Sequence, residues 1–145
     1  MKKLVLLLSW LIISGSVSAQ SGTNLEELEN LVKQGDLAAQ IELANAYRKG
    51  IGVTQDYKTA VKWFTIAAEQ GDALAQYNLG RLYYLGKGVP DNLLYAHMWA
   101  TQASSNGSDM AIDFTDLLTE LMTEKQIEKA KRLRKECVIK QYKGC

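Results

Sequence analysis

Apolar residues recur along this chain at helical spacing, and two such sets lie on either side of a glycine pair. The first set consists of Ala39, Leu43 and Tyr47, and the second of Ala60, Trp63 and Ala67. Steps of three and four residues place each set on one face of a helix. Gly50 and Gly52 separate the sets, and a glycine ends a helix cheaply because it tolerates a left-handed backbone. The pattern predicts a helix, a tight turn and a second helix.

The whole pattern of residues 35–70 returns in residues 71–106. Aligned without a gap, the two segments are identical at 13 of 36 positions. The identical pairs include Leu43 and Leu79, Tyr47 and Tyr83, Gly50 and Gly86, Gly52 and Gly88, and Trp63 and Trp99. One pair of short helices cannot bury its apolar face, whereas stacked pairs share a continuous core. We therefore expect an all-α protein, an α/α superhelical solenoid of helix-turn-helix repeats.

Further helices are expected on both sides of the two repeats. Thr23 or Asn24 can cap a first helix that runs to about residue 34. A helix near 109–121 follows the second repeat, and Thr123 with Gln126 forms a capping-box pattern before a last helix. The expected organisation is an N-terminal capping helix at 20–34, repeats at 35–70 and 71–106, and a partial repeat with a C-terminal capping helix at 107–145.

Residues 1–19 have the pattern of a cleavable signal peptide. Lys2 and Lys3 precede an apolar run, and small residues then lead to Ala19. The apolar run is shorter than the roughly 20 residues that span a bilayer. An uncleaved interfacial anchor is the alternative interpretation. We expect a periplasmic or secreted protein with no stable membrane insertion after cleavage.

Export affects the interpretation of the only two cysteines, Cys137 and Cys145. An oxidising compartment permits a disulfide between them. A metal site needs more ligands, and the only histidine, His97, is distant in sequence. A redox pair usually has C-x-x-C spacing, which these residues lack. We expect a structural disulfide that holds the tail.

The charge balance disfavours two classes of partner. Without residues 1–19 the chain has 15 basic and 16 acidic residues, which argues against nucleic acid and against membrane surfaces as general partners. The last helix is locally basic, with eight basic residues between Lys125 and Lys143. A solvated helix explains this cluster, and a surface for an acidic partner or an anionic envelope is the alternative.

Residues suited to catalysis are few. His97 stands where the first repeat has Val61, which favours a packed or surface histidine over a general base. The sequence contains no G-x-S-x-G, S-x-x-K or H-E-x-x-H motif. The glycine pairs lack the preceding strand and the G-K-[ST] ending of a phosphate loop. We expect no enzyme activity, no cofactor and no metal site.

The repeats resemble a known family. The segments A-Q-Y-N-L-G-R-L-Y-Y-L-G-K-G-V-P at 75–90 and Y-A-H-M-W-A-T-Q-A at 95–103 are similar to a Sel-one-like repeat, a relative of the tetratricopeptide repeat. The resemblance is strong over residues 35–106 and weaker over 24–34 and 107–136. It implies an α-solenoid, with a capping helix of the type found in exported members. A β-lactamase-like branch of the family places a cysteine pair in its repeats, which this chain lacks there.

A solenoid usually binds its partner on the concave face. In the tetratricopeptide relatives the first helix of each repeat lines that face. Taking Leu43 and Leu79 as buried anchors, the groove positions are Ile41, Glu42, Asn45 and Arg48 in the first repeat and Tyr77, Asn78, Arg81 and Tyr84 in the second. These positions differ between the repeats while the core positions recur. This contrast is typical of a binding surface on a constant framework, and an ordinary exposed helix face is the alternative.

We expect an exported, monomeric, non-enzymatic module that binds a protein segment along this face. Asn78 and Arg81 would bond a peptide backbone or a carboxylate there, with tyrosines as rigid contacts. One alternative is a cell-envelope enzyme or ligand binder of the β-lactamase-like branch. Another is a structural adaptor that oligomerises through its end helices.

Overall fold

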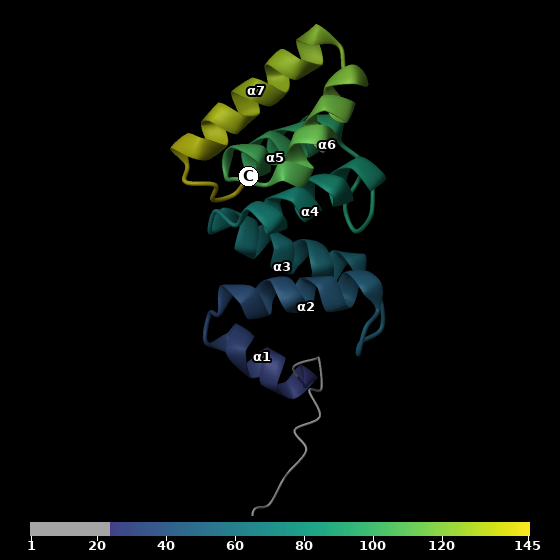
Figure 1. Ribbon diagram of the computed structural model, residues 1–145, viewed down its shortest axis with the longest axis vertical. Coiled ribbons are helices and arrows are strands. Elements are labelled where there is room, and N and C mark those ends of the chain that lie inside the picture. Colours follow the sequence, from purple (N-terminus) through teal and green to yellow (C-terminus); the bar gives the residue numbers. More distant parts are fainter. Residues whose placement is uncertain (1–23) are drawn as a thin grey trace, which may run out of the picture.

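The computed structural model describes residues 24–145, and over this range the chain forms seven α-helices and no strand. They are α1 (Leu25–Lys33), α2 (Leu37–Lys49), α3 (Tyr57–Glu69), α4 (Ala73–Leu85), α5 (Leu93–Ser105), α6 (Asp109–Glu120) and α7 (Glu124–Ile139). Helices α1 to α5 stack in chain order along the longest axis of the molecule (Figure 1). The prediction of an all-α solenoid is confirmed. The signal peptide predicted at 1–19 lies outside the described residues.

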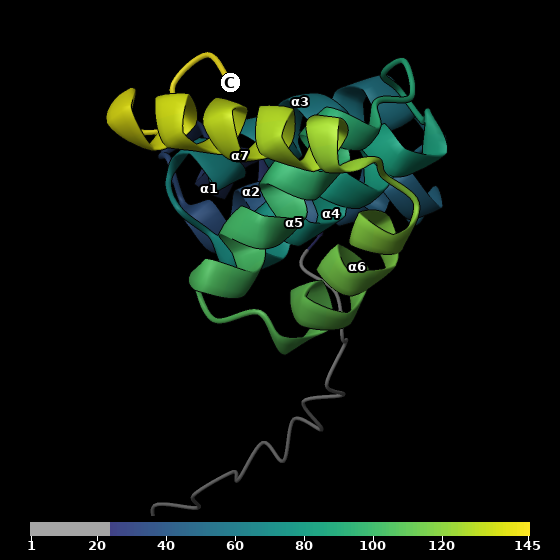
Figure 2. The same ribbon diagram turned by 90° about the horizontal axis from the view of Figure 1, so that it is seen from above.

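Each helix packs mainly on its neighbours in sequence, and the last helix is the exception. The pair α2 and α3 forms one layer, and the pair α4 and α5 forms the next. Helix α7 turns back and packs on α5, at a steep angle to α6 (Figure 2). One end of the stack is therefore covered by α1 and the other by α6 and α7.

Side-chain caps fix where the helices begin. Asp36 and Asp72 occupy equivalent positions, and each carboxylate accepts a hydrogen bond of 2.7 Å from the backbone N–H three residues later. The predicted capping box of Thr123 and Gln126 is present at the start of α7. Such caps satisfy backbone donors that have no partner inside the helix.

Glycines end the first helix of each repeat, as the sequence predicts. Gly50 and Gly86 are the C-caps of α2 and α4 and have left-handed φ angles of 71° and 61°. Gly88 has a second role, because a Cβ atom at this position would overlap the backbone of Tyr57 and Lys58 at the start of α3. The turn after α4 therefore lies directly on the first repeat.

The core is built from small residues that bring helices close and large residues that fill the remaining space. Phe64 and Trp99 are at most 1% exposed and belong to the main cluster with Leu79 and Met98. Gly80 lies in the middle of α4, where a Cβ atom would be 3.1 Å from the carbonyl oxygen of Ala96. The contact of α4 with α5 is thus nearly backbone to backbone.

Two buried glutamines connect the start of one helix to the end of another, within a repeat and between repeats. The Oε1 atom of Gln40 accepts a hydrogen bond of 2.8 Å from Gln70. At the equivalent place, Oε1 of Gln76 accepts one of 2.9 Å from Asn106, while its Nε2 donates to the carbonyl of Ala68 over 3.0 Å. The repeated Ala-Gln pair of the sequence therefore serves to join the start of one helix to the end of another.

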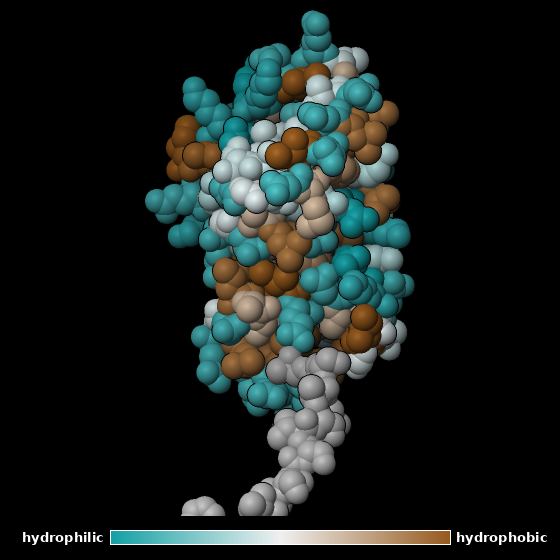
Figure 3. Space-filling view, in the orientation of Figure 1, coloured by the Kyte–Doolittle hydropathy of each residue, from teal (hydrophilic) through white to brown (hydrophobic). Residues whose placement is uncertain are grey.

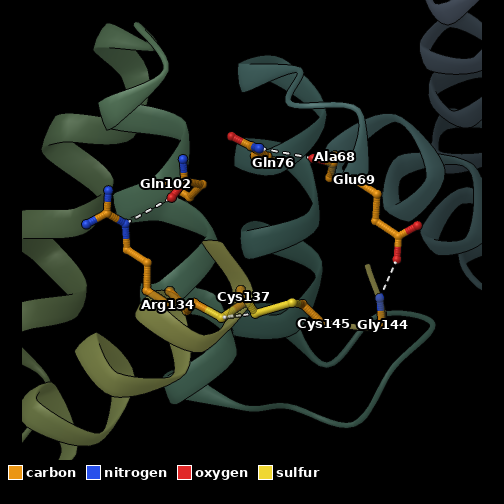
Figure 4. Close-up of a disulfide and its surroundings, with 9 residues drawn as sticks. Ala68, Glu69, Gln76, Gln102, Arg134, Cys137, Gly144 and Cys145 are labelled. Carbon is orange, nitrogen blue, oxygen red and sulfur yellow. Dashed lines mark hydrogen bonds between the residues drawn. A yellow bond between two sulfur atoms is a disulfide. The ribbon is translucent and has the colours of Figure 1, made fainter. Parts of the chain in front are cut away.

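The C-terminal tail is held by a disulfide and by polar contacts (Figure 4). Cys137 and Cys145 are bonded, with Cα atoms 5.7 Å apart, in agreement with the expected pairing. The N–H of Gly144 donates to Glu69 over 3.0 Å, which ties the tail to α3. Nε of Arg134 donates to Gln102 over 3.0 Å, which ties α7 to α5. The last helix and the tail are thus part of the stack.

Candidate binding groove

The first helices of the repeats present a shared face, and a groove of about 620 Å³ lies across them. Of the eight predicted positions, those that line it are Ile41, Glu42, Asn45, Arg48, Tyr77, Asn78 and Arg81. Ala38, Lys49, Leu74 and Met110 complete the lining. Residues taken from two repeats by one positional rule therefore meet at a single groove.

Tyr84 is the predicted position that does not line this groove. Its ring packs edge-on against Phe114 of α6, with ring centroids 5.8 Å apart. The reason is the partial third repeat, whose first helix places Phe114 against this part of α4. Tyr84 therefore contributes to the contact between α4 and α6.

Hydrogen bonds within α2 hold the polar side chains of the groove in place. The amide nitrogen of Asn45 donates to the carbonyl of Ile41 over 3.1 Å. Its Oδ1 atom accepts from Nε and Nη2 of Arg48, at 3.2 and 2.9 Å. The half-buried guanidinium of Arg48 is thus positioned by a neutral partner.

The side chains of α4 are ordered in a different way. The guanidinium of Arg81 lies over the ring of Tyr77, 5.7 Å from its centroid, within the range of a cation–π contact. Tyr77 in turn packs edge-on against Phe114 at 5.8 Å. Asn78 is only 6% exposed and donates to the carbonyl of Leu74 over 3.0 Å. The ring of Tyr77 therefore contacts both the guanidinium of Arg81 and the ring of Phe114.

A smaller cavity of about 90 Å³ continues the groove at the C-terminal ends of α2 and α4. Arg48, Asn78 and Arg81 line both spaces. Tyr57 and Lys87 line only the small cavity, where the Lys87 ammonium lies 3.4 Å from the Tyr57 hydroxyl. Tyr57 and Lys87 lie outside the first helices of the repeats, so the periodicity of those helices does not predict them.

The charge around these spaces is mainly positive. Arg48, Lys49 and Arg81 face the groove together with a single carboxylate, that of Glu42. The lining of the small cavity has three cations and no carboxylate. Within residues 24–145, none of its three cations forms an ion pair. Apolar and charged surfaces alternate over the stack (Figure 3).

His97 lies apart from both spaces. It is 5% exposed in the core of α5, and its Nε2 atom is 3.1 Å from the Thr119 hydroxyl. Burial lowers its pKa below the ordinary 6.5, and the charge of Lys131 acts in the same direction. It is a packed histidine, as its position in the repeat suggests.

Basic α7 is largely a solvated helix. Within the described chain the one ion pair of this helix joins Lys131 and Glu128, 2.8 Å apart and both largely exposed. In the same range no helix is long and apolar enough to cross a membrane, and no cluster of three metal-ligating side chains occurs.

Comparisons with known proteins identify the repeats. The family description "Sel1 repeat" matches residues 37–72 and 73–108. A solved structure of a protective antigen present in uropathogenic Escherichia coli strains, displaying an SLR fold, is 32% identical, with a TM-score of 0.77 over 84% of this chain. A Sel1 repeat protein from Oxalobacter formigenes is 34% identical, with a TM-score of 0.61 over 65% of this chain.

These relatives are longer proteins. The present chain spans 27% of the antigen and 40% of the Oxalobacter formigenes protein. A search of curated proteins found no match. The similarity to known proteins therefore covers the repeats and their fold.

Proposed function

Because this chain is a Sel1 repeat protein, we propose that it is an exported, non-enzymatic scaffold whose groove binds a segment of another protein. Sel1 repeats are typically found in protein–protein interaction. The observation that carries the proposal is the groove, where side chains that differ between the repeats gather on helices whose core positions recur. The scaffold acts as a monomer and uses no cofactor.

The order within the groove supports binding. Association loses the entropy of every side chain that it must immobilise, so a surface held by its own contacts loses less. Arg48 is already fixed by Asn45, and Arg81 by Tyr77. Arginine and tyrosine also supply a large share of the binding energy at protein interfaces. These residues are the proposed anchors of the interface.

The disulfide supports export. Disulfides persist in the periplasm and outside cells and are rare in the reducing cytosol. The bond of Cys137 with Cys145 fits such a compartment. We place the protein in the periplasm or outside the cell, after removal of residues 1–19.

Catalysis of the β-lactamase-like type finds little support in the groove. Its described lining residues include no serine, cysteine or histidine. A nucleophile with a neighbouring base is the arrangement that acyl transfer requires. We therefore keep the scaffold as the proposed function.

Site-specific crosslinking in the native host tests the proposal. A photoreactive residue is placed at Leu74, an exposed groove position, and at Ile112 as a control on the exposed surface of α6 outside the groove. We expect a protein to be crosslinked from position 74 and not from position 112. The adduct should disappear when Tyr77→Ala and Arg81→Ala are added to a chain that still folds. Equal labelling from both positions would contradict binding in the groove.

A further inference from the structure

Apolar and charged groups are separated along the groove. Ala38, Leu74 and Met110 lie in the first turns of α2, α4 and α6, 36 residues apart, and all three are exposed. We call them the apolar row. Arg81 follows Leu74 by seven residues on the same helix, which is about 10 Å along the helix axis. The groove thus offers apolar contact at one end and positive charge at the other.

The charged end is the small cavity described above. Its cations come from three places in the fold: Arg48 from α2, Arg81 from α4, and Lys87 from the turn after α4. The Tyr57 hydroxyl accepts hydrogen bonds from Lys87 and from Gln55, at 3.4 and 3.1 Å. Tyr57 is the one tyrosine among the described lining residues. The cavity is therefore rich in donors that have no carboxylate to accept them.

Stabilisation of helix ends explains only part of this charge. Cations near a helix C-terminus interact favourably with the helix dipole. Arg48 and Lys49 lie in the last turn of α2 and fit that explanation. Arg81 lies before the last turn of α4, which has no basic residue, and its position over Tyr77 directs it to the groove. The helix dipole therefore does not explain the position of Arg81 in the cavity.

We propose that the small cavity binds the carboxylate of an aspartate or glutamate side chain in the partner segment, while an apolar side chain of the same segment lies on the apolar row. This inference rests on the proposed function and specifies the chemistry of the segment. Guanidinium groups form the strongest protein hydrogen bonds with carboxylates and often do so in pairs. An extended chain advances about 3.3 Å per residue, so a separation of about 10 Å corresponds to about three residues.

Selection from a random peptide library tests this inference. Peptides of about twelve residues displayed on phage are selected on the immobilised exported protein. We expect the enriched sequences to carry an aspartate or glutamate about three positions from a large apolar residue. Binding is then measured by fluorescence anisotropy with a synthetic enriched peptide and with a second copy that has asparagine or glutamine in place of the acid.

Two double variants separate the cavity from general charge. Arg48→Gln with Arg81→Gln removes two cations from the cavity, and Lys131→Gln with Arg132→Gln removes two from α7. The cavity variant should weaken binding of the acidic peptide about tenfold or more, because guanidinium–carboxylate hydrogen bonds are lost. The α7 variant should weaken it about twofold or less, because its charges lie outside the cavity and act on the peptide only from a distance. The peptide with asparagine or glutamine in place of the acid should bind the wild type weakly, and its affinity should fall little further in the cavity variant. Thermal melting checks that both variants fold.

The outcomes distinguish this inference from the proposed function. Enriched peptides without an acid, bound equally by the cavity variant but lost in Leu74→Asp, would overturn the carboxylate site and leave groove binding intact. Acidic peptides that bind both double variants equally weakly would place recognition in general charge and would also overturn it. Failure to enrich any peptide would contradict both proposals.

Discussion

Equivalent residues of the two repeats can have the same backbone and different surroundings. Gly52 and Gly88 have φ angles of 72° and 76°. Nothing lies within 4 Å of a Cβ atom built at Gly52, whereas one at Gly88 would overlap the backbone of Tyr57 and Lys58. The pair therefore separates the cost of a left-handed backbone from the cost of a steric overlap.

We expect Gly52→Ala to lower the free energy of unfolding by about 1–2 kcal/mol, because only the left-handed conformation is penalised. Gly88→Ala should cost clearly more, since the turn must also move away from α3. Urea denaturation of the two variants measures the difference. A smaller loss for Gly88→Ala would show that the turn does not lie on the first repeat.

His97 gives the stability a specific dependence on pH. The pKa of this histidine is lowered in the folded protein, because burial disfavours the charged ring and Lys131 repels it. The unfolded chain therefore binds the proton more readily, and stability falls as the pH drops through about 6.5 toward the folded pKa. Melting temperatures between about pH 7.5 and 5 should fall more steeply for the wild type than for His97→Gln. Parallel curves would contradict this assignment.

At the scale of the element, the contact of α4 with α5 depends on Gly80. Gly80→Val should lower the free energy of unfolding by about 1–3 kcal/mol, because the side chain would meet the backbone of Ala96 and Ala100 at 3.1–3.3 Å. Valine has a higher helix propensity than glycine, so a loss of stability cannot come from helix propensity. Circular dichroism during urea denaturation provides the measurement. An unchanged free energy of unfolding would mean that the two helices separate easily here.

The last helix and its tail should depend on the disulfide. Cys145→Ser is expected to lower the free energy of unfolding by about 2–3 kcal/mol, the chain-entropy value for a loop with a separation of 8 residues. The change leaves buried Cys137 in place. A reductant should destabilise the wild type by a similar amount and leave the variant unchanged. A wild type indifferent to reductant would show that the bond does not stabilise the fold.

The sequence predicts elements well because their signals are local. Helical spacing, the Thr123 cap and the glycine C-caps depend on neighbours within a few residues, and the structure has all of them. Burial was harder to assign. The recurrence of Trp63 as Trp99 predicts a core position, yet Trp63 is half-buried, while the unmatched Phe64 is fully buried. Position 64 corresponds to buried Ala100, so burial recurs there although the residue does not.

The groove was predictable only where the repeats supply a register. Residues on α2 and α4 could be placed from Leu43 and Leu79, and seven of eight line the groove. The surroundings of Tyr84 could not be predicted in this way, because its neighbour Phe114 belongs to a partial repeat that lacks the glycine turn. Tyr57 and Lys87 reach the small cavity through tertiary folding, which periodicity along one helix does not encode.

At the scale of the whole molecule, the stack transmits stability between neighbours. Leu28 is 3% exposed in the cluster that joins α1 to α2, while α4 and α5 belong to another part of the core. Leu28→Ala should cost about 2 kcal/mol or more. Hydrogen exchange is expected to accelerate in α1 and the start of α2 and to remain slow in α5, since a repeat contacts only its neighbours. Uniform acceleration would indicate a fully cooperative molecule.

The recurrence of tryptophan makes each repeat optically distinguishable. Trp63 in α3 and Trp99 in α5 are the two tryptophans of residues 24–145, one in each helix pair. Trp99 lies in a dry environment at 1% exposure, while the ring of half-buried Trp63 has the Lys62 ammonium 5.4 Å from its centroid. Replacing either ring with phenylalanine leaves one tryptophan within residues 24–145, in a known layer of the stack. Two such chains allow the opening of each layer to be followed separately in real time.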